Sequence, residues 1–281
     1  ETEMDVDKLR DLTRPTDAPA LSVTVDGVRT DFSPRAITAV VGPNGSGKTT
    51  LMGRIAGRLS GGEVSPEGAD VVLLTQRPGL PPRSTAVGAV AMVTRDKVRA
   101  QELLAAAGLY ELADVPVPAL SGGQAAHVAL VRALAAQPAV LIVDEPLAAV
   151  DVKSAERWRR FLHAVRADRT TLLVTHDALD IAHLAQDMLV MESGQVRAHG
   201  ATARLFEAPP TGFVAALAGL NRLEGTVTEI GASAVEVACG DITVLAATEH
   251  ASLAPGQKVA VTFDPHAATI GAAQEPCNQW A

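Results

Sequence analysis

ITAVVGPNGSGKT, residues 37–49, is an apolar run followed by a glycine-rich loop that ends in Lys48 and Thr49. A strand before such a loop and a helix after it are the context in which it binds phosphate. The glycines let backbone N–H groups converge on phosphate oxygens, Lys48 extends to the terminal phosphates, and the Thr49 hydroxyl ligates magnesium. An ordinary glycine-rich turn is the alternative, and the flanking patterns favour nucleotide binding. The predicted nucleotide-binding residues are Gly42, Pro43, Asn44, Gly45, Ser46, Gly47, Lys48, Thr49 and Thr50.

Three further apolar runs, at 71–75, 140–144 and 171–175, alternate with helical patterns. Parallel strands need crossover connections and leave both sheet faces buried, so the alternation predicts a largely parallel sheet covered by helices. The stretch 78–118 interrupts it with helical patterns and no convincing strand. The predicted fold class is α/β, a phosphate-loop (P-loop) NTPase sheet with an inserted helical lobe.

Two adjacent carboxylates, Asp144 and Glu145, follow the second of these runs. Parallel sheets bind ligands at the carboxyl ends of their strands, where both residues would lie. Asp144 would ligate magnesium, and Glu145 would accept a proton from, or orient, the water that attacks the terminal phosphate. Taken alone, an Asp-Glu pair after a strand is more often a solvated loop.

A second candidate anion site is LSGGQ at 120–124, which precedes a helical run at 125–136. The Ser121 hydroxyl and the backbone N–H groups at a helix start attract anions. One chain therefore offers two phosphate-binding turns.

The order of GPNGSGKT, LSGGQ and LIVDEP (141–146) closely resembles the ATPase subunits of ABC transporters, over about residues 21–206. The resemblance implies ATP and Mg²⁺ as cofactors and a head-to-tail dimer. In this dimer, Ser121 and Gly123 of one copy close over ATP held by the Lys48 loop of the other. Gly122 and Gln124 complete this second predicted set.

The resemblance also assigns three single residues. Gln76 matches the glutamine loop, which approaches the magnesium and the attacking water. His176 matches the switch histidine, which contacts the terminal phosphate and holds Glu145. Asp151 fits the loop that crosses the dimer interface, although the residues around it differ from the usual sequence of the family. A surface glutamine and a structural histidine are the plainer alternatives. The predicted catalytic residues are Glu145, His176 and Gln76, and the predicted metal ligands are Thr49, Gln76 and Asp144.

The chain departs from the family at two places. The family usually stacks adenine on an aromatic side chain upstream of the phosphate loop, yet no aromatic residue precedes Phe32 and the only tyrosine is Tyr110. We therefore expect weak discrimination between ATP and GTP. His127 stands where the family commonly has an arginine, which leaves the contacts of its helix open.

Composition excludes other classes. The 281 residues are 47% hydrophobic, which is typical of a globular protein, and no apolar run approaches the ~20 residues that cross a bilayer. The net charge of −8 and the absence of a basic run argue against nucleic acid as a partner. Two cysteines, Cys239 and Cys277, make no disulfide framework and are expected to be inert.

The predicted organisation has five parts. They are a flexible leader (1–20), an ABC ATPase domain (21–207, with its helical lobe at about 78–118), a linker (208–221), a small regulatory barrel (222–270) and a tail (271–281). The barrel is predicted as antiparallel and OB-like, because short alternating strands are punctuated there by glycine and proline.

The C-terminal part resembles the barrel appended to ATPases of importers for molybdate, sulfate, iron and related solutes. It implies an importer whose solute is molybdate or tungstate, with another oxyanion or a metal as the alternative. The barrel either binds an oxyanion or only stabilises the dimer, and its candidate ligands by chemistry are Thr226, Thr228, Ser233, Thr243 and Lys258.

The expected partners are a second copy, an extracytoplasmic solute-binding protein and a permease, either separate or fused upstream of Glu1. The expected location is the cytoplasmic face of the cell membrane, with peripheral attachment. Two rival hypotheses are a soluble ABC ATPase that acts on DNA or ribosomes, and an oxyanion-binding protein whose cassette has lost catalysis. The single signature motif and the intact Lys48, Asp144, Glu145 and His176 argue against them.

Overall fold

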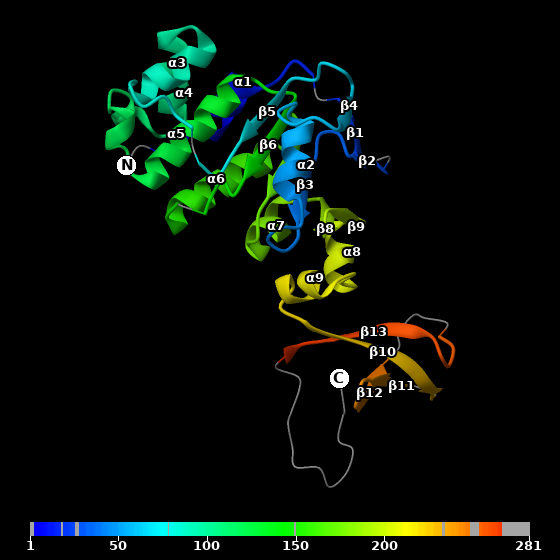
Figure 1. Ribbon diagram of the computed structural model, residues 1–281. Coiled ribbons are helices and arrows are strands. Elements are labelled where there is room, and N and C mark those ends of the chain that lie inside the picture. The colour runs from blue at the N-terminus through cyan, green and yellow to red at the C-terminus, as the bar shows by residue number, and fades with distance from the viewer. Residues whose placement is uncertain are drawn as a thin grey trace. The chain divides into compact units, whose positions relative to one another are not determined.

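The computed structural model forms two compact units, residues 1–203 and 204–281, each described here by itself (Figure 1). The structure describes residues 3–17, 19–25, 28–77, 79–148, 150–231, 234–247 and 253–265. Within these residues no helix is both long and apolar enough to cross a membrane.

The first unit is built on a six-stranded sheet of order β5-β6-β7-β3-β8-β9. The strands are β3 (Ile37–Val41), β5 (Val71–Leu74), β6 (Val140–Asp144), β7 (Thr170–Val174), β8 (Asp187–Glu192) and β9 (Gln195–Ala201). All neighbours pair in parallel except β8 and β9. Every residue of β3 and β7 is buried, as expected for central parallel strands. The predicted α/β fold is therefore confirmed.

A second sheet, which the sequence analysis did not predict, has the order β2-β1-β4 and is antiparallel. It consists of β1 (Leu21–Val25), β2 (Val28–Phe32) and β4 (Gly62–Ser65). Its apolar residues share one buried cluster with helix α2 (Lys48–Ile55) and the central sheet. This cluster contains Leu21, Val23, Phe32, Val40, Leu51, Met52, Ile55, Val140, Ile142, Leu172, Val174, Leu189 and Met191. The helix that follows the phosphate loop is thus anchored between two sheets.

The region predicted as a helical lobe contains α3 (Ala86–Thr94), α4 (Lys97–Ala106) and two 3-10 turns at Tyr110–Leu112 and Val117–Ala119. Helix α5 (Gly122–Ala135) packs on both α3 and α4. The lobe therefore includes the helix that follows the LSGGQ sequence. Two more helices, α6 (Val152–Val165) and α7 (Ala178–Leu184), contact each other.

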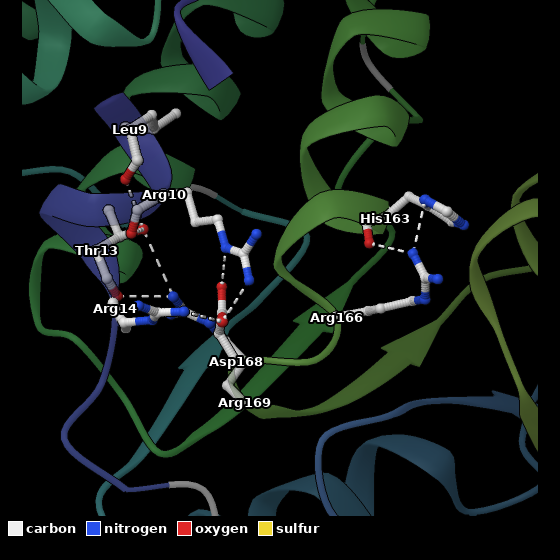
Figure 2. A network of polar contacts seen from close by, with 8 residues as sticks. All are labelled: Leu9, Arg10, Thr13, Arg14, His163, Arg166, Asp168 and Arg169. Carbon is white, nitrogen blue, oxygen red and sulfur yellow. Dashed lines mark hydrogen bonds and ion pairs between the residues drawn. The ribbon is translucent and has the colours of Figure 1, made fainter. Parts of the chain in front are cut away.

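The N-terminal segment folds, so the prediction of a flexible leader is wrong. Residues Val6–Thr13 form helix α1, whose Leu9 and Thr13 are completely buried. Arg10 and Arg14 pair with Asp168, and Arg169 donates to the Thr13 carbonyl (Figure 2). The segment is short and mostly polar, and tertiary contacts rather than a long apolar stripe hold it in place.

The second unit contains α9 (Gly212–Leu217) and a four-stranded antiparallel sheet of order β12-β11-β10-β13. Helix α8 (Thr202–Glu207) crosses the boundary between the units. The strands are β10 (Asn221–Ile230), β11 (Ala234–Cys239), β12 (Ile242–Ala247) and β13 (Lys258–Phe263), and their small core contains Val227, Val235 and Val237.

The structure bears on the predictions for the linker, the barrel and the cysteines. The predicted linker, 208–221, contains α9, which Thr211 caps and which contacts β10. The predicted OB-like barrel is not confirmed, because the described strands form one open sheet. Cys239 is a half-buried free thiol whose pKa is raised by burial. The tail 271–281, with Cys277, lies outside the described residues.

Candidate functional site

The phosphate loop requires glycine at two positions. Gly42 has φ +150°, and a Cβ there would overlap the carbonyl oxygen of Met191 in β8. Gly47, with φ +97°, is the N-cap of α2, and a Cβ there would lie 3.3 Å from Gly194 Cα. The loop is therefore pressed against the β8–β9 hairpin, and only glycine allows this approach.

Lys48 folds back over the loop. Its Nζ donates to the carbonyl oxygens of Gly42 at 2.7 Å and Pro43 at 3.0 Å. Burial lowers the pKa of the half-buried Lys48, and the negative charges of Asp144 and Glu145 oppose this effect. The ammonium group is thus held above the loop, where an added phosphate would meet both it and the uncapped N-terminus of α2.

The central sheet brings most predicted site residues into one cavity of ≈ 530 Å³. It is lined by Asn44, Gly45, Ser46, Gly47, Lys48, Thr49, Thr50, Gln76, Asp144, Glu145, Val174 and His176. They come from the phosphate loop and from the carboxyl ends of β5, β6 and β7. Gly42 and Pro43 are not among the lining residues, but their carbonyl oxygens accept hydrogen bonds from Nζ of Lys48, which does line the cavity.

Glu145 is fixed in an unusual conformation. Its φ is +51°, and its backbone N–H donates to the Val174 carbonyl at 2.9 Å, which ties it to the end of β7. The positive φ is costly for a residue with a side chain, and such strain is found at functional sites. Its carboxylate is therefore aimed by the backbone of two neighbouring strands.

His176 holds one oxygen of that carboxylate. Its backbone N–H donates to Glu145 Oε1 at 3.1 Å, and its Nδ1 lies 2.6 Å from the same oxygen. Among the described residues, Glu145 Oε2 accepts only from the Thr175 hydroxyl, at 3.4 Å. The hydrogen bond that His176 donates to Glu145 raises the pKa of His176, although the histidine side chain is 78% exposed and solvent weakens the effect.

The oxygen donors suit magnesium. Thr49, Gln76 and Asp144 line the same cavity and offer a hydroxyl, an amide and a carboxylate, which are hard ligands. Burial raises the pKa of Asp144, and the Glu145 charge adds to this, while Lys48 opposes it. The described residues contain no group of three or more His, Cys, Asp or Glu able to hold a metal. Magnesium usually binds one or two carboxylates together with substrate phosphates, so this donor set fits.

The signature residues lie elsewhere. Ser121 is the N-cap of α5, where its hydroxyl accepts from Gln124 N at 3.2 Å and its N–H donates to Gln124 Oε1 at 2.9 Å. Asp151 caps α6 and accepts from Ser154 N at 3.0 Å. None of Ser121, Gly122, Gly123, Gln124 or Asp151 is among the described residues that line the phosphate-loop cavity. The structure therefore does not bring the two predicted phosphate-binding turns together within one chain.

Sequence reasoning missed a second cavity, of ≈ 550 Å³, next to the loop. Its walls are Val23, Val25, Val28, Thr30, Gly47, Thr50, Leu51, Arg54, Met191, Gly194, Gln195 and Val196. Gly47 and Thr50 line both cavities. An apolar space thus adjoins the phosphate cavity where the nucleoside part of a nucleotide would extend. The only sequence signal was the run of β-branched residues at 23–30.

His127 occupies a buried position between α5 and α6. Its ring centroid lies 5.7 Å from that of Trp158, and its Nε2 has no hydrogen-bond partner. Burial lowers the pKa of His127 to about 4, with a smaller opposing effect of Asp151. His127 is therefore a neutral packing residue behind the signature turn, in contrast to the arginine common in the family.

The fold and this cavity define a nucleotide-binding cassette, and comparison with known proteins agrees. The ABC transporter family profile matches residues 25–148. The chain is 37% identical over 223 residues to the molybdenum import ATP-binding protein ModC of Mycobacterium tuberculosis, an alignment that covers 68% of this chain and 60% of the relative. It is 34% identical over 255 residues to the sulfate/thiosulfate import ATP-binding protein CysA of Ralstonia nicotianae, with coverage of 78% and 68%. The chain belongs to the ABC transporter ATP-binding family.

Solved structures share the fold. The dimeric structure of MJ0796, a bacterial ABC transporter cassette, aligns with a TM-score of 0.59 at 22% identity, over 64% of this chain and 98% of that one. A post-hydrolysis dimer of MJ0796 bound to ADP and Pi aligns with a TM-score of 0.56 at 23% identity, over 66% and 97%. The chain spans 60% of the length of the mycobacterial relative.

Proposed function

We propose that this chain is the ATP-hydrolysing subunit of an ABC importer and that it works as a head-to-tail dimer. ATP binds to the Lys48 loop of one copy and is covered by Ser121 and Gly123 of the other. One observation supports this most strongly: the phosphate-loop cavity gathers Lys48, Asp144, Glu145 and His176, but none of the signature residues. The MJ0796 cassette, which has the same fold, was solved as a dimer.

The chain's own groups account for the chemistry. Lys48 and the N–H groups of the loop hold the phosphates. Thr49, Gln76 and Asp144 would hold a Mg²⁺ ion, which would supply positive charge to the phosphates when bound. Glu145 Oε1 is held by His176, so the more weakly bonded Oε2 is the oxygen available to the attacking water. Glu145 orients this water or accepts its proton, and His176 keeps the carboxylate in place.

The apolar cavity holds the base without aromatic stacking. Its aliphatic walls would contact either purine through dispersion forces. These forces depend little on the exocyclic groups that distinguish adenine from guanine. We therefore propose weak discrimination between ATP and GTP. A preference for ATP of more than about tenfold in competition would contradict this, because it requires about 1.4 kcal/mol of differential binding.

The transported solute is proposed from relatives. Proteins named for molybdenum, sulfate/thiosulfate and sn-glycerol-3-phosphate import match this chain at 34–37% identity. We propose molybdate or tungstate, with sulfate or another solute as the alternative. The subunit would act on the cytoplasmic face of the membrane, with a transmembrane permease and an extracytoplasmic solute-binding protein as partners.

The second unit is proposed to bind an oxyanion, because one cavity on its sheet has two cationic side chains, Arg222 and Lys258, against one carboxylate, Glu224. A cavity of ≈ 510 Å³ there is lined by Arg222, Glu224, Gly225, Thr226, Ala238, Gly240, Lys258, Val259 and Ala260. Arg222 pairs with Glu224 at 2.6 Å, and its buried Nε has no hydrogen-bond partner. Of the predicted ligands, Thr226 and Lys258 line this cavity, Thr228 donates to the Glu236 carbonyl instead, Thr243 is not among the lining residues, and Ser233 lies outside the described residues.

Calorimetry with molybdate and with sulfate on the whole chain tests the oxyanion proposal. Binding heat that disappears in the Arg222→Ala variant supports the proposal. If neither anion gives binding heat, the proposal fails and the remaining role of the unit is to stabilise the dimer.

Removal of the Lys48 ammonium tests the ATPase proposal. Lys48→Ala should weaken nucleotide binding itself, because the cation above the loop is gone. Lys97→Ala is the matched control, since Lys97 also opens a helix, α4, but is exposed and far from the cavity linings. Retained turnover in Lys48→Ala, or no ATP hydrolysis by the unaltered chain with magnesium, would overturn the proposed function.

A further inference from the structure

The N-terminal segment connects two parts of the first unit. We call residues 5–14, which contain α1, the N-terminal strap. Helix α1 contacts α4 of the helical lobe, α5, which packs on both the lobe and strand β5 of the central sheet, and α6. Figure 1 shows α1 among these helices. A segment held on both sides resists relative movement of the two parts.

The attachment to the lobe uses the backbone of the strap. Asp5 N donates to the Ala106 carbonyl at the end of α4, at 2.8 Å. The Leu12 carbonyl accepts from Arg99 of α4 at 2.9 Å and from Gln137, just beyond α5, at 3.3 Å. The strap therefore joins the ends of the two lobe helices.

The attachment to the core uses side chains on the turn between α6 and β7. Arg10 donates to both oxygens of Asp168, at 2.6 and 2.8 Å, and Arg14 adds a contact at 3.3 Å (Figure 2). The Asp168 side chain is only 4% exposed, and the hydrogen bond from Arg10 is the main reason that its pKa is lowered. Leu9 is completely buried. This attachment leads directly into β7, which ends two residues before His176.

The same attachment contains a cost. Arg169 is completely buried and donates to the Thr13 carbonyl at 2.6 Å, but its Nε and Nη1 have no hydrogen-bond partner among the residues that the structure describes. A buried polar group without a partner is unfavourable, and lifting the strap would let water satisfy it. Docking of the strap is therefore opposed by this buried guanidinium and favoured by the Asp168 pairs and Leu9.

We propose that the N-terminal strap is a positioning element that sets the helical lobe on the core and thereby places the Ser121 turn at the start of α5. Its effect on turnover rests on the proposed function. The strap touches no residue of the phosphate-loop cavity, so it acts on the closing of the site and not on nucleotide capture. When the strap is loosened, the Ser121 turn occupies a wider range of positions relative to the core. A small misplacement of a residue far from the reacting atoms is enough to slow turnover.

Arg10→Gln tests this, because it removes the bidentate pair at a partly exposed position and leaves Leu9 in the core. Arg166→Gln is the matched control: Arg166 also makes two contacts through its guanidinium, both to His163, and it touches no strap residue (Figure 2). Arg10→Lys keeps the charge and should retain most of the turnover. Thermal unfolding is measured for each variant, and removal of residues 1–14 is a second, stronger perturbation.

Two readouts are compared with the unaltered chain. In Arg10→Gln, hydrogen exchange should increase in α1, α4 and the end of α5, while α2 and β3 keep their protection. The kcat for ATP should fall about 3- to 10-fold while KM stays within about twofold. Arg166→Gln should change neither.

Unchanged exchange in α4 and α5 when α1 itself becomes exposed would overturn the proposal, because the strap would then not hold the lobe. An increased KM with unchanged kcat would also overturn it. If the unaltered chain hydrolyses no ATP, the proposed function fails, and the exchange measurement still decides whether the strap holds the lobe.

Discussion

The starts of α2 and α5 are both glycine-containing turns, yet they differ in how they are capped and in which side chains surround them. The α2 start has Gly47 as an N-cap without a side-chain cap, Lys48 above it, and the carboxylates of Asp144 and Glu145 in the same cavity. The α5 start is closed by its own capping box, and none of the residues Ser121–Gln124 lines that cavity. The first is equipped for chemistry and the second only for covering an anion. In the proposed head-to-tail dimer, the two turns would be the two halves of one shared site, with each chain supplying one half to each site.

The largest expected effect separates chemistry from binding at the α2 start. Glu145→Gln should lower kcat by about 10²–10⁴, because the carboxylate that handles the attacking water is gone. ATP binding and dimer formation should persist, since the phosphate loop is intact. Light scattering with ATP and magnesium checks the dimer, and a colorimetric phosphate assay checks turnover. Wild-type turnover in this variant would remove Glu145 from the mechanism.

The next effect concerns the α5 start. Ser121→Arg should reduce turnover by about 10²-fold, because a long charged side chain prevents the turn from approaching the partner's nucleotide. Binding of ATP to the single chain should stay unchanged in equilibrium titration. Val98→Arg, at an exposed position of α4 in the same lobe, is the control and should be active. Loss of ATP binding in Ser121→Arg would place this turn in the same site as Lys48.

The His176 contact predicts a pH dependence. The hydrogen bond to Glu145 raises the pKa of His176 above its ordinary 6.5, so the charged pair is complete below 6.5 and is lost as the pH rises through the folded value. Turnover should therefore decline on the alkaline side. His176→Ala should be about tenfold slower and should lack this decline. A profile of the same shape in both proteins would mean that another group controls it.

The smallest effect concerns the apolar cavity. Val28 lies on its rim and is 59% exposed. Val28→Tyr should strengthen ATP binding by about 0.5–1.5 kcal/mol, through stacking that the chain lacks. Met92→Tyr, an equally exposed position on α3, should change nothing. Equal affinities for Val28→Tyr and the unaltered chain would show that the base lies elsewhere.

Much of the candidate site at the carboxyl ends of the central strands was predictable, because short local sequence patterns specify it. The apolar run before Lys48 is β3, and Asp144 ends β6, as the patterns indicated. The rule that ligands bind at the carboxyl ends of parallel strands predicted Glu145, and the family resemblance predicted Gln76 and His176; all three line one cavity.

The rest depends on contacts between distant residues. Helix α1 is held by Asp168, which is 158 residues from Arg10, so no local pattern announces it. Strand β4 pairs with β1 only after the chain has passed through α2, and the apolar cavity combines β1 and β2 with α2 and the distant β8–β9 hairpin. The open sheet of the second unit follows from long-range pairing, which alternation alone does not specify.

The shared site is tested most directly by mixing two inactive variants, Lys48→Ala and Ser121→Arg. In a mixed dimer, the intact Lys48 loop of one chain faces the intact Ser121 turn of the other, which rebuilds one complete site. We predict that the mixture hydrolyses ATP much faster than either variant does alone. A mixture as inactive as its components, under conditions in which mixed dimers are shown to form, would contradict the account.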